Sequence, residues 1–306
     1  MSGREQLTPT TAQRISLPGP ADWPGPLAAL DADPTRDGDP AAGTVVLLPG
    51  YTGSKEDFAP ILDPLRSNGF RALAVDLPGQ YESAGPDDEN AYGPLALGRV
   101  CADVVAGLAA DGPLVLLGHS FGGLVARGAA LHGAPLAGLI LLCSGPAAFR
   151  SGERLESLRS GEPIIRAQGK VVVYDSTVAV GRAARKPVPA DVAALLRRRF
   201  VESNQAGLLG MGTALQTEPD RVEDLHRQLT SSGTPVAVIA GAQDDAWPLV
   251  DQQQMAARLG TDLVLVDDAA HSPAVENPMG LLAVLLPLLR DWVNPSARRD
   301  PGSPRQ

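Results

Sequence analysis

Cysteine and aromatic residues are scarce in this chain, and each scarcity narrows the class of protein. Only two cysteines, Cys101 and Cys143, occur in 306 residues, and both lie in apolar stretches. A disulfide framework of the kind found in small secreted proteins is therefore excluded. Aromatic residues make up 4% of the chain beside 33 glycines and 28 prolines, a balance that predicts many turns.

Long hydrophobic runs are missing as well. The first ten residues are polar, and no apolar run of signal-peptide length follows them. The most apolar stretch near the C-terminus, residues 280–289, is interrupted by Pro287 and is too short to span a bilayer. We therefore expect a soluble, cytoplasmic protein that has no membrane partner.

Positive charge is in deficit. The chain has 26 Lys and Arg against 35 Asp and Glu, for a net charge of −9, which repels the phosphate backbone of nucleic acids. With 44% hydrophobic and 20% charged residues it has the composition of a globular protein. We expect a small-molecule substrate, no nucleic-acid partner, and a monomer or homodimer.

Short apolar runs of strand length alternate with helix-length segments from residue 44 onward. Unbroken apolar runs are typical of strands buried on both faces, which predicts an α/β fold with a mostly parallel, doubly wound sheet. Two shorter strand-like pieces, residues 13–17 and 27–31, lie in the Pro- and Gly-rich lead-in. The six main runs are residues 44–48, 71–76, 113–118, 136–143, 234–241 and 262–267.

The alternation stops after Cys143 and resumes only at Thr234, which is longer than a simple crossover. We interpret this stretch as a helical cap inserted after the sixth strand. The predicted division is a core of residues 1–145 and 233–294, a cap of residues 146–232, and a disordered tail of residues 295–306. Helices are predicted in the cap at residues 152–160, 190–202, 205–216 and 221–230.

The motif Gly-His-Ser-Phe-Gly, residues 118–122, follows one of these strands and precedes a helix. A strand that turns sharply into a helix holds its central residue in a strained conformation, and flanking glycines let the backbone pass. Ser120 is therefore the candidate nucleophile. As a bare serine at a helix start, it is also a candidate N-cap.

A nucleophilic serine needs a base, and four histidines are available. His132 ends a helix, His226 lies among charged residues of the predicted cap, and His119 adjoins the serine but is expected to point away from it. His271 follows the last strand, at the same end of the sheet as Ser120, and is the candidate base. A solvated loop histidine is the alternative.

The base must be oriented by a carboxylate, which stabilises the imidazolium. Asp244 and Asp245 both follow the strand at residues 234–241, and only one can face the histidine. We choose Asp244 and keep Asp245 as the alternative, each being also a candidate helix cap. The order Ser, Asp, His is the one expected for this elbow architecture.

The oxyanion that forms on attack needs hydrogen-bond donors. Pro49 to Ser54 form a glycine-bearing turn, and we choose the backbone amide of Tyr51 there together with the amide of Phe121. A phosphate-binding loop is disfavoured because its lysine and glycine spacing are absent. No metal or organic cofactor is expected.

Four motifs carry a resemblance to the α/β-hydrolase superfamily over residues 44–293. They are Leu-Leu-Pro-Gly-Tyr-Thr-Gly-Ser, Gly-His-Ser-Phe-Gly-Gly, Gly-Ala-Gln-Asp-Asp-Ala-Trp-Pro and Ala-Ala-His-Ser-Pro-Ala-Val-Glu-Asn-Pro. The resemblance implies a serine-nucleophile, esterase- or lipase-like member with Ser120, Asp244 and His271 as triad and the Tyr51 and Phe121 amides as oxyanion hole.

Two departures from the family pattern stand out. Many relatives have His-Gly where this chain has Pro49-Gly50, and the loop after Asp76 reads Leu-Pro-Gly-Gln-Tyr-Glu-Ser instead of the usual glycine-rich turn. Neither affects the predicted triad. Serine at the elbow, instead of aspartate, disfavours the epoxide-hydrolase and dehalogenase branches.

We therefore expect a serine hydrolase that acts on a small or medium apolar carboxylic ester through an acyl-enzyme. The alternatives are a carbon–carbon bond hydrolase, a lactonase or a thioesterase on the same triad, and a non-catalytic hydrolase-fold receptor. The basic run 197–199 either steers an anionic substrate or forms a solvated helix face. Leu208, Leu209, Met211 and Leu215 line the acyl pocket or form the cap's own core.

Overall fold

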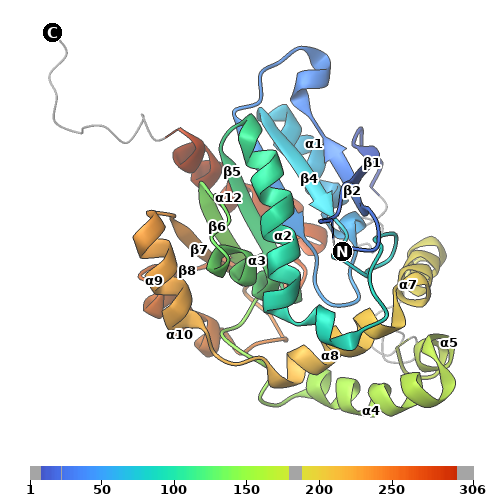
Figure 1. Ribbon diagram of the computed structural model, residues 1–306. Coiled ribbons are helices and arrows are strands. Elements are labelled where there is room, and N and C mark those ends of the chain that lie inside the picture. The colour runs from blue at the N-terminus through green and yellow to red at the C-terminus, as the bar shows by residue number, and fades with distance from the viewer. Residues whose placement is uncertain (1–7, 22, 179–187, 295–306) are drawn as a thin grey trace, which may run out of the picture.

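The computed structural model describes residues 8–21, 23–178 and 188–294 and contains one eight-stranded sheet (Figure 1). The strand order is β1-β2-β4-β3-β5-β6-β7-β8; β3 to β8 run parallel, and β1 and β2 pair antiparallel at one edge. The predicted α/β fold with a mostly parallel sheet is confirmed, and the tail at residues 295–306 lies outside the described residues. The strands are β1 (Gln13–Leu17), β2 (Leu27–Ala32), β3 (Gly43–Leu48), β4 (Phe70–Val75), β5 (Leu114–His119), β6 (Gly138–Leu142), β7 (Val236–Gly241) and β8 (Leu263–Val266).

Burial on both faces explains why the central strands read as unbroken apolar runs. In β3 every residue is buried; Val46 and Leu48 belong to the core on one face of the sheet, and Val45 and Leu47 to the core on the other. Successive side chains of a strand point to opposite faces, so a strand with helices on both sides must be apolar throughout.

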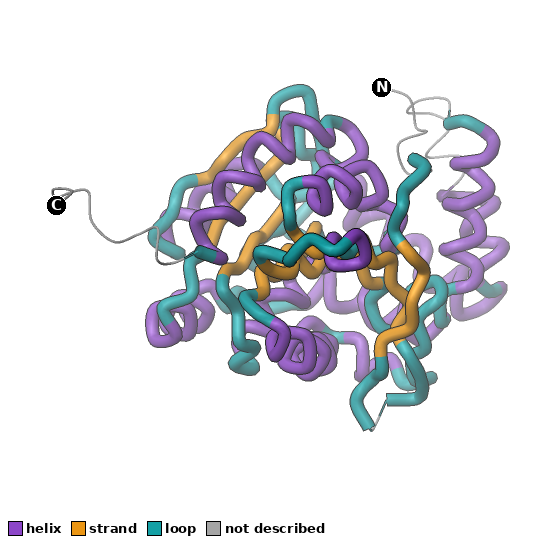
Figure 2. Tube along the Cα trace, turned by 90° about the horizontal axis from the view of Figure 1, so that it is seen from above, coloured by secondary structure: helices purple, strands orange, loops and turns teal. Residues whose placement is uncertain are grey.

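Helices cover both faces of the sheet, and Figure 2 shows the strands lying between them. α2, α3, α9 and α10 contribute to the core on one face, and α1, α11 and α12 to the core on the other. No helix of the described residues is long and apolar enough to cross a membrane. These helices are α1 (Ala59–Ser67), α2 (Pro94–Leu108), α3 (Phe121–Leu131), α9 (Val222–Ser232), α10 (Leu249–Arg258), α11 (Pro273–Glu276) and α12 (Pro278–Val293).

The segment between β6 and β7 departs from this layered pattern. Its helices α4, α5, α7 and α8 lie beyond one end of the sheet, on the side where the parallel strands end (Figure 1). We call residues 143–221 the inserted segment. Its elements are α4 (Glu153–Gln168), α5 (Lys170–Val173), a π-helical turn (Tyr174–Val178), α7 (Ala190–Glu202) and α8 (Gln205–Thr217).

One helix expected in the cap has a different place. The helix predicted at residues 221–230 is present as α9, but Val222, Leu225 and Leu229 pack into the core beside α3. Their spacing gives α9 one apolar stripe, and this stripe is buried in the core on one face of the sheet. The domain limits stay a prediction, with the end of the cap moved from residue 232 toward residue 221.

Candidate active site

The turn between β5 and α3 has the strained geometry that the motif predicts. Ser120 adopts φ 56° and ψ −120°, a conformation that L-residues rarely take. A Cβ at Gly118 would overlap the backbone of Gly122, and one at Gly122 would overlap the carbonyl oxygen of Leu48. Both glycines are therefore required for β3, β5 and α3 to approach this closely.

The structure brings the three predicted triad residues into one hydrogen-bonded chain. His271 Nε2 lies 2.9 Å from Ser120 Oγ, and His271 Nδ1 lies 2.8 Å from Asp244 Oδ1. The three side chains follow β5, β7 and β8, which are parallel and end at the same edge of the sheet. The arrangement has the geometry of a general base held between a hydroxyl and a carboxylate.

Asp244 is held in place by more than the histidine. Its Oδ1 also accepts from the amide of Ala246 at 3.0 Å, and its Oδ2 accepts from Gln252 Nε2 at 2.8 Å. Burial opposes ionisation of Asp244, but the hydrogen bond and charge of His271, together with these donors, hold its pKa below the usual range. The carboxylate is therefore ionised beside the imidazole.

The alternative acid, Asp245, lies in different surroundings. Its side chain is half exposed, and its Oδ1 accepts from Arg154 Nη2 at 2.5 Å. Arg154 comes from α4 of the inserted segment. The two adjacent acids therefore make different contacts. Asp244 contacts His271, whereas Asp245 pairs with an arginine of the inserted segment.

Two further side chains hold the loop that carries His271. Glu276 Oε2 accepts from the amides of Ala270 and Ser272, at 2.7 and 3.1 Å. His119 Nε2 lies 2.6 Å from the carbonyl oxygen of His271, so Nε2 must carry the hydrogen. Burial, together with the neighbouring His271, lowers the pKa of His119 to about 4 and keeps its ring neutral.

The predicted oxyanion turn lies directly against the serine. A Cβ added to Gly50 would come within 2.9 Å of Ser120 Cβ and 3.3 Å of its Oγ. Phe121 is the first residue of α3, so its amide has no helical carbonyl partner. The structure thus brings the segments of both predicted donors, Tyr51 and Phe121, next to Ser120, and their role as an oxyanion hole stays a prediction.

Sequence reasoning missed the side chains that support this site. Gln252 contacts the side chain of Asp244, and Glu276 and His119 contact the backbone of the loop that carries His271. Gln80 Nε2 donates to the carbonyl oxygen of Gly50 at 2.9 Å. Gln80 stands in a loop that departs from the family pattern, which was the one available signal. The others follow no periodic pattern that marks them.

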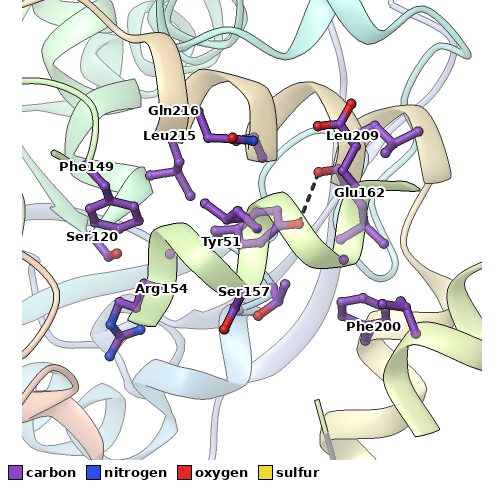
Figure 3. Close-up of a pocket in the computed structure, with 18 of the residues that line it drawn as sticks. Tyr51, Ser120, Phe149, Arg154, Ser157, Glu162, Phe200, Leu209, Leu215 and Gln216 are labelled. Atoms are coloured by element: carbon purple, nitrogen blue, oxygen red, sulfur yellow. Dashed lines mark hydrogen bonds between the residues drawn. The ribbon is translucent and has the colours of Figure 1, made fainter. Parts of the chain in front are cut away.

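A cavity of about 400 Å³ opens beside Ser120, between the sheet edge and the inserted segment (Figure 3). Leu208, Leu209 and Leu215 line it, whereas Met211 packs in the core. In Figure 3 Phe149 and Leu215 lie near Ser120, and Leu209 and Phe200 lie on the far side of Tyr51. The remaining apolar lining residues are Leu158, Ile165 and Val173.

Potential metal ligands in the described residues coincide with the predicted triad. One group is His119, Cys143 and His271, and the other is Asp244, Asp245 and His271, with ligand atoms within 4.8 Å of one another. Both require His271, whose two ring nitrogens already contact Ser120 and Asp244. A metal bound there would therefore break the hydrogen-bonded chain, and these residues do not fit a resident metal.

Comparison with known proteins identifies the family to which this fold belongs. The chain is 27% identical over 270 residues to a 2-succinyl-6-hydroxy-2,4-cyclohexadiene-1-carboxylate synthase of Escherichia coli, covering 83% of this chain and 97% of that protein. The solved esterase from Thermogutta terrifontis superposes with a TM-score of 0.69 at 23% identity, over 92% of this chain and 99% of that one.

A carboxylesterase structure from Nitrososphaera gargenis gives a TM-score of 0.70 at 20% identity, over 92% of this chain and 100% of that one. At these identities the two structures establish the shared fold. A model of the alpha/beta hydrolase family matches residues 45–284, which include Ser120, Asp244 and His271. This match spans most of the chain, and the two solved esterases share the fold. The protein is therefore a hydrolase enzyme of the alpha/beta hydrolase family.

Proposed function

We propose that this enzyme hydrolyses a neutral carboxylic ester of small or medium size, with Ser120 as nucleophile. One observation carries the proposal: His271 lies within hydrogen-bond distance of both Ser120 Oγ and Asp244 Oδ1, at 2.9 and 2.8 Å. This is the arrangement that a hydroxyl needs in order to lose its proton as it attacks a carbonyl.

The first half of the proposed reaction forms an acyl-enzyme. His271 Nε2 takes the proton of Ser120 as Oγ bonds to the ester carbonyl carbon, and the amides of Tyr51 and Phe121 donate to the oxyanion. Asp244 stabilises the imidazolium. The carbon–oxygen bond to the alcohol then breaks, and the alcohol leaves with the proton from His271.

The second half restores the enzyme. Water gives a proton to His271 Nε2 as its oxygen bonds to the acyl carbon, and a second oxyanion forms at the same amides. The bond to Ser120 Oγ then breaks, Oγ recovers its proton from His271, and a carboxylic acid leaves. The predicted cap would cover both steps.

The charges around the cavity favour a neutral substrate. Within the described residues, every Asp, Glu or Arg that lines the cavity has an oppositely charged partner in the protein, so no uncompensated charge attracts an ion. These pairs are Asp57 with Arg199 at 2.6 Å, Arg154 with Asp245 at 2.5 Å, and Glu162 with Arg166 at 3.0 Å. Apolar side chains on both sides of Tyr51 suit a hydrocarbon portion of the substrate.

The test is ester turnover by the purified enzyme and its Ser120→Ala variant. We expect the variant to lose roughly 10⁴-fold or more of kcat/KM on 4-nitrophenyl acetate and butyrate. Ser157→Ala is the matched control, because Ser157 lines the same cavity and its loss should leave turnover within a few-fold. Turnover that survives Ser120→Ala in protein cleared of contaminating esterases would overturn the proposal.

A carbon–carbon bond reaction on the same triad is the second candidate. It is favoured by the 27% identity to a cyclohexadiene-carboxylate synthase over 97% of that protein's length. The paired charges of the cavity count against a carboxylate substrate. A Ser120 that reacts with a fluorophosphonate while the enzyme turns over no ester, thioester or lactone would favour this candidate over the first.

A further inference from the structure

Arg199 differs from the other two arginines of its basic run. All three lie on α7 of the inserted segment, but Arg197 and Arg198 are exposed, whereas Arg199 is 5% exposed. Removing a guanidinium from water is costly unless a partner compensates its charge. The position of Arg199 therefore depends on the groups that it contacts.

The partners of Arg199 belong to the sheet side of the cavity. Its Nη1 donates to Asp57 Oδ1 at 2.6 Å and lies 3.3 Å from Ser54 Oγ. Ser54 ends the turn that begins at Gly50, and Asp57 lies in the 3₁₀ helix that follows it, Lys55–Phe58. An ion pair between buried Arg199 and the partly buried Asp57 thus joins α7 to the segment next to Ser120.

Asp57 in turn holds the predicted oxyanion turn. Its Oδ2 accepts from the amide of Ser54 at 3.3 Å, and the Ser54 side chain accepts from the amide of Asp57 in a reciprocal cap. Gly53 donates to the carbonyl oxygen of Gly50 at 2.9 Å, and a Cβ on Gly53 would come within 2.6 Å of Asp57 Oδ2. The position of Asp57 therefore limits where the turn can lie.

A second contact from the inserted segment reaches the middle of the same turn. The hydroxyl of Tyr51 donates to the carbonyl oxygen of Leu208 at 3.2 Å, the dashed bond in Figure 3. Between Tyr51 and Gly53, Thr52 adopts φ 60°, a conformation that needs support from its surroundings. α7 and α8 thus both contact the turn or the residues that follow it.

We infer that Arg199 is a positioning residue for catalysis. Through Asp57 it holds the turn so that the Tyr51 amide faces the developing oxyanion, and the oxyanion site is complete only with the inserted segment docked. The inference rests on the proposed function, because it presupposes acyl transfer to Ser120. It assigns to Arg199 an effect on kcat, since a misplaced donor weakens the transition state and leaves ground-state binding largely intact.

Direct binding of substrate by Arg199 is the competing explanation. Arg199 lines the cavity, and its Nε is buried without a hydrogen-bond partner among the described residues. A binding role would raise KM for substrates that carry an acidic group and would leave small neutral esters untouched. Its pairing with Asp57 favours the positioning role, and the two roles differ in the kinetic constant that they change.

The experiment compares variants of the full chain on 4-nitrophenyl acetate. We expect Arg199→Met to lower kcat roughly ten- to a hundredfold with KM within about twofold. Arg199→Lys, which keeps the charge, should recover part of the loss. Arg197→Met is the matched control, because Arg197 lies on the same helix in an exposed pair with Asp175 and should leave kcat unchanged.

Arg199→Met removes the guanidinium that pairs with the Asp57 carboxylate, which could prevent folding, so a second variant is needed. Arg199→Met combined with Asp57→Asn removes both charges, while the asparagine can still accept from the amide of Ser54. This double variant should show the same loss of kcat as Arg199→Met. Circular dichroism and thermal unfolding of each variant identify which of them fold like the wild type. If Arg199→Met does not fold, the kcat of the double variant tests the inference.

Three results would overturn the inference. A folded double variant with wild-type kcat would refute the positioning role of Arg199 and leave the proposed function intact. A rise in KM for the 4-nitrophenyl monoester of succinic acid, with kcat on the acetate unchanged, would make Arg199 a binding residue instead. A wild-type enzyme that neither turns over the acetate nor accepts a fluorophosphonate on Ser120 would overturn the proposed function. The positioning role of Arg199 would then fall as well.

Discussion

The side-chain amide of Gln80 donates a hydrogen bond of 2.9 Å to the carbonyl oxygen of Gly50, the residue that packs on Ser120. Gln80 is 1% exposed, and its Oε1 lies 3.3 Å from the amide of Leu77. Pro49 and the loop after Asp76, which contains Gln80, are the two departures from the family pattern noted in the sequence. The loop after β4 therefore contacts the predicted oxyanion turn at Gly50, the residue next to Pro49.

Replacing Gln80 should therefore affect catalysis more than stability. In Gln80→Leu the turn loses its donor at Gly50, and we expect kcat on 4-nitrophenyl acetate to fall roughly tenfold or more, as for other small displacements of catalytic groups. The free energy of unfolding should fall by only about 1 to 3 kcal/mol, the cost of leaving buried partners unbonded. Steady-state kinetics and urea denaturation measure the two effects.

A glutamine on the other side of the cavity provides the control for this prediction. Gln216 Nε2 donates to the carbonyl oxygen of Gly212 within α8 and has no contact with the turn among the hydrogen bonds of the described residues. Gln216→Leu should leave kcat within a few-fold. Equal kcat in the Gln80 and Gln216 variants would refute a role for Gln80 at the turn.

Substitution of Asp244 and of the adjacent Asp245 should affect kcat very differently. Asp244→Asn removes the carboxylate beside His271 Nδ1, and we expect kcat to fall roughly 10⁴-fold because the imidazole loses its preferred tautomer. Asp245→Asn weakens a half-exposed pair with Arg154, away from His271, and should stay within a few-fold of the wild type. The reverse order of the two effects on ester turnover would show that the acid is misassigned.

His119 gives the stability of the fold a dependence on pH. In the unfolded chain this histidine titrates near its ordinary pKa of 6.5, whereas burial lowers its pKa to about 4 in the folded chain. Between these values the unfolded state binds more protons, so stability is lost as the pH falls from 6.5 to 4. The shift corresponds to about 3 kcal/mol at most.

The variant His119→Gln isolates this contribution. Glutamine keeps an N–H that can donate to the carbonyl oxygen of His271 but does not titrate. Urea denaturation at several pH values should therefore show a smaller loss of stability between pH 6.5 and 4 in the variant than in the wild type. Parallel curves for the two proteins would mean that His119 is not buried in its neutral form.

Much of the fold could be predicted because its signals are local. The apolar run of β3 and the Gly118 to Gly122 motif each carry their own physical requirement, burial on both faces in one case and a close backbone approach in the other. The helices α7 and α8 begin at the predicted residues, Ala190 and Gln205.

The placement of α9 and the extent of α4 could not be predicted in the same way. An apolar stripe such as that of Val222, Leu225 and Leu229 reveals that a helix packs on something, but not on what. α4 continues past the predicted end at residue 160 and through Pro163 to Gln168. Gly161 and Pro163 favour an earlier end of the helix, but Ile165 packs against other apolar residues of the inserted segment and supports the later turns.

The residues that support the site could not be predicted from the sequence, for a related reason. Arg199 meets Asp57, and Gln252 meets Asp244, only after the chain has folded. Arg199 stands beside two exposed arginines in sequence, so nothing in its local context distinguishes it. Triad positions follow strand ends and can be found by order along the chain, whereas supporting contacts depend on the docking of separate elements.

The intact mass of the protein after brief exposure to a fluorophosphonate, with the modified peptide located, tests the central claim most directly. This reagent reports an activated serine without requiring the true substrate. We expect one adduct, on Ser120, and none on Ser157 or Ser160, which line the same cavity. A folded protein that stays unmodified, or that carries the adduct on another serine, would contradict the assignment of Ser120 as the nucleophile.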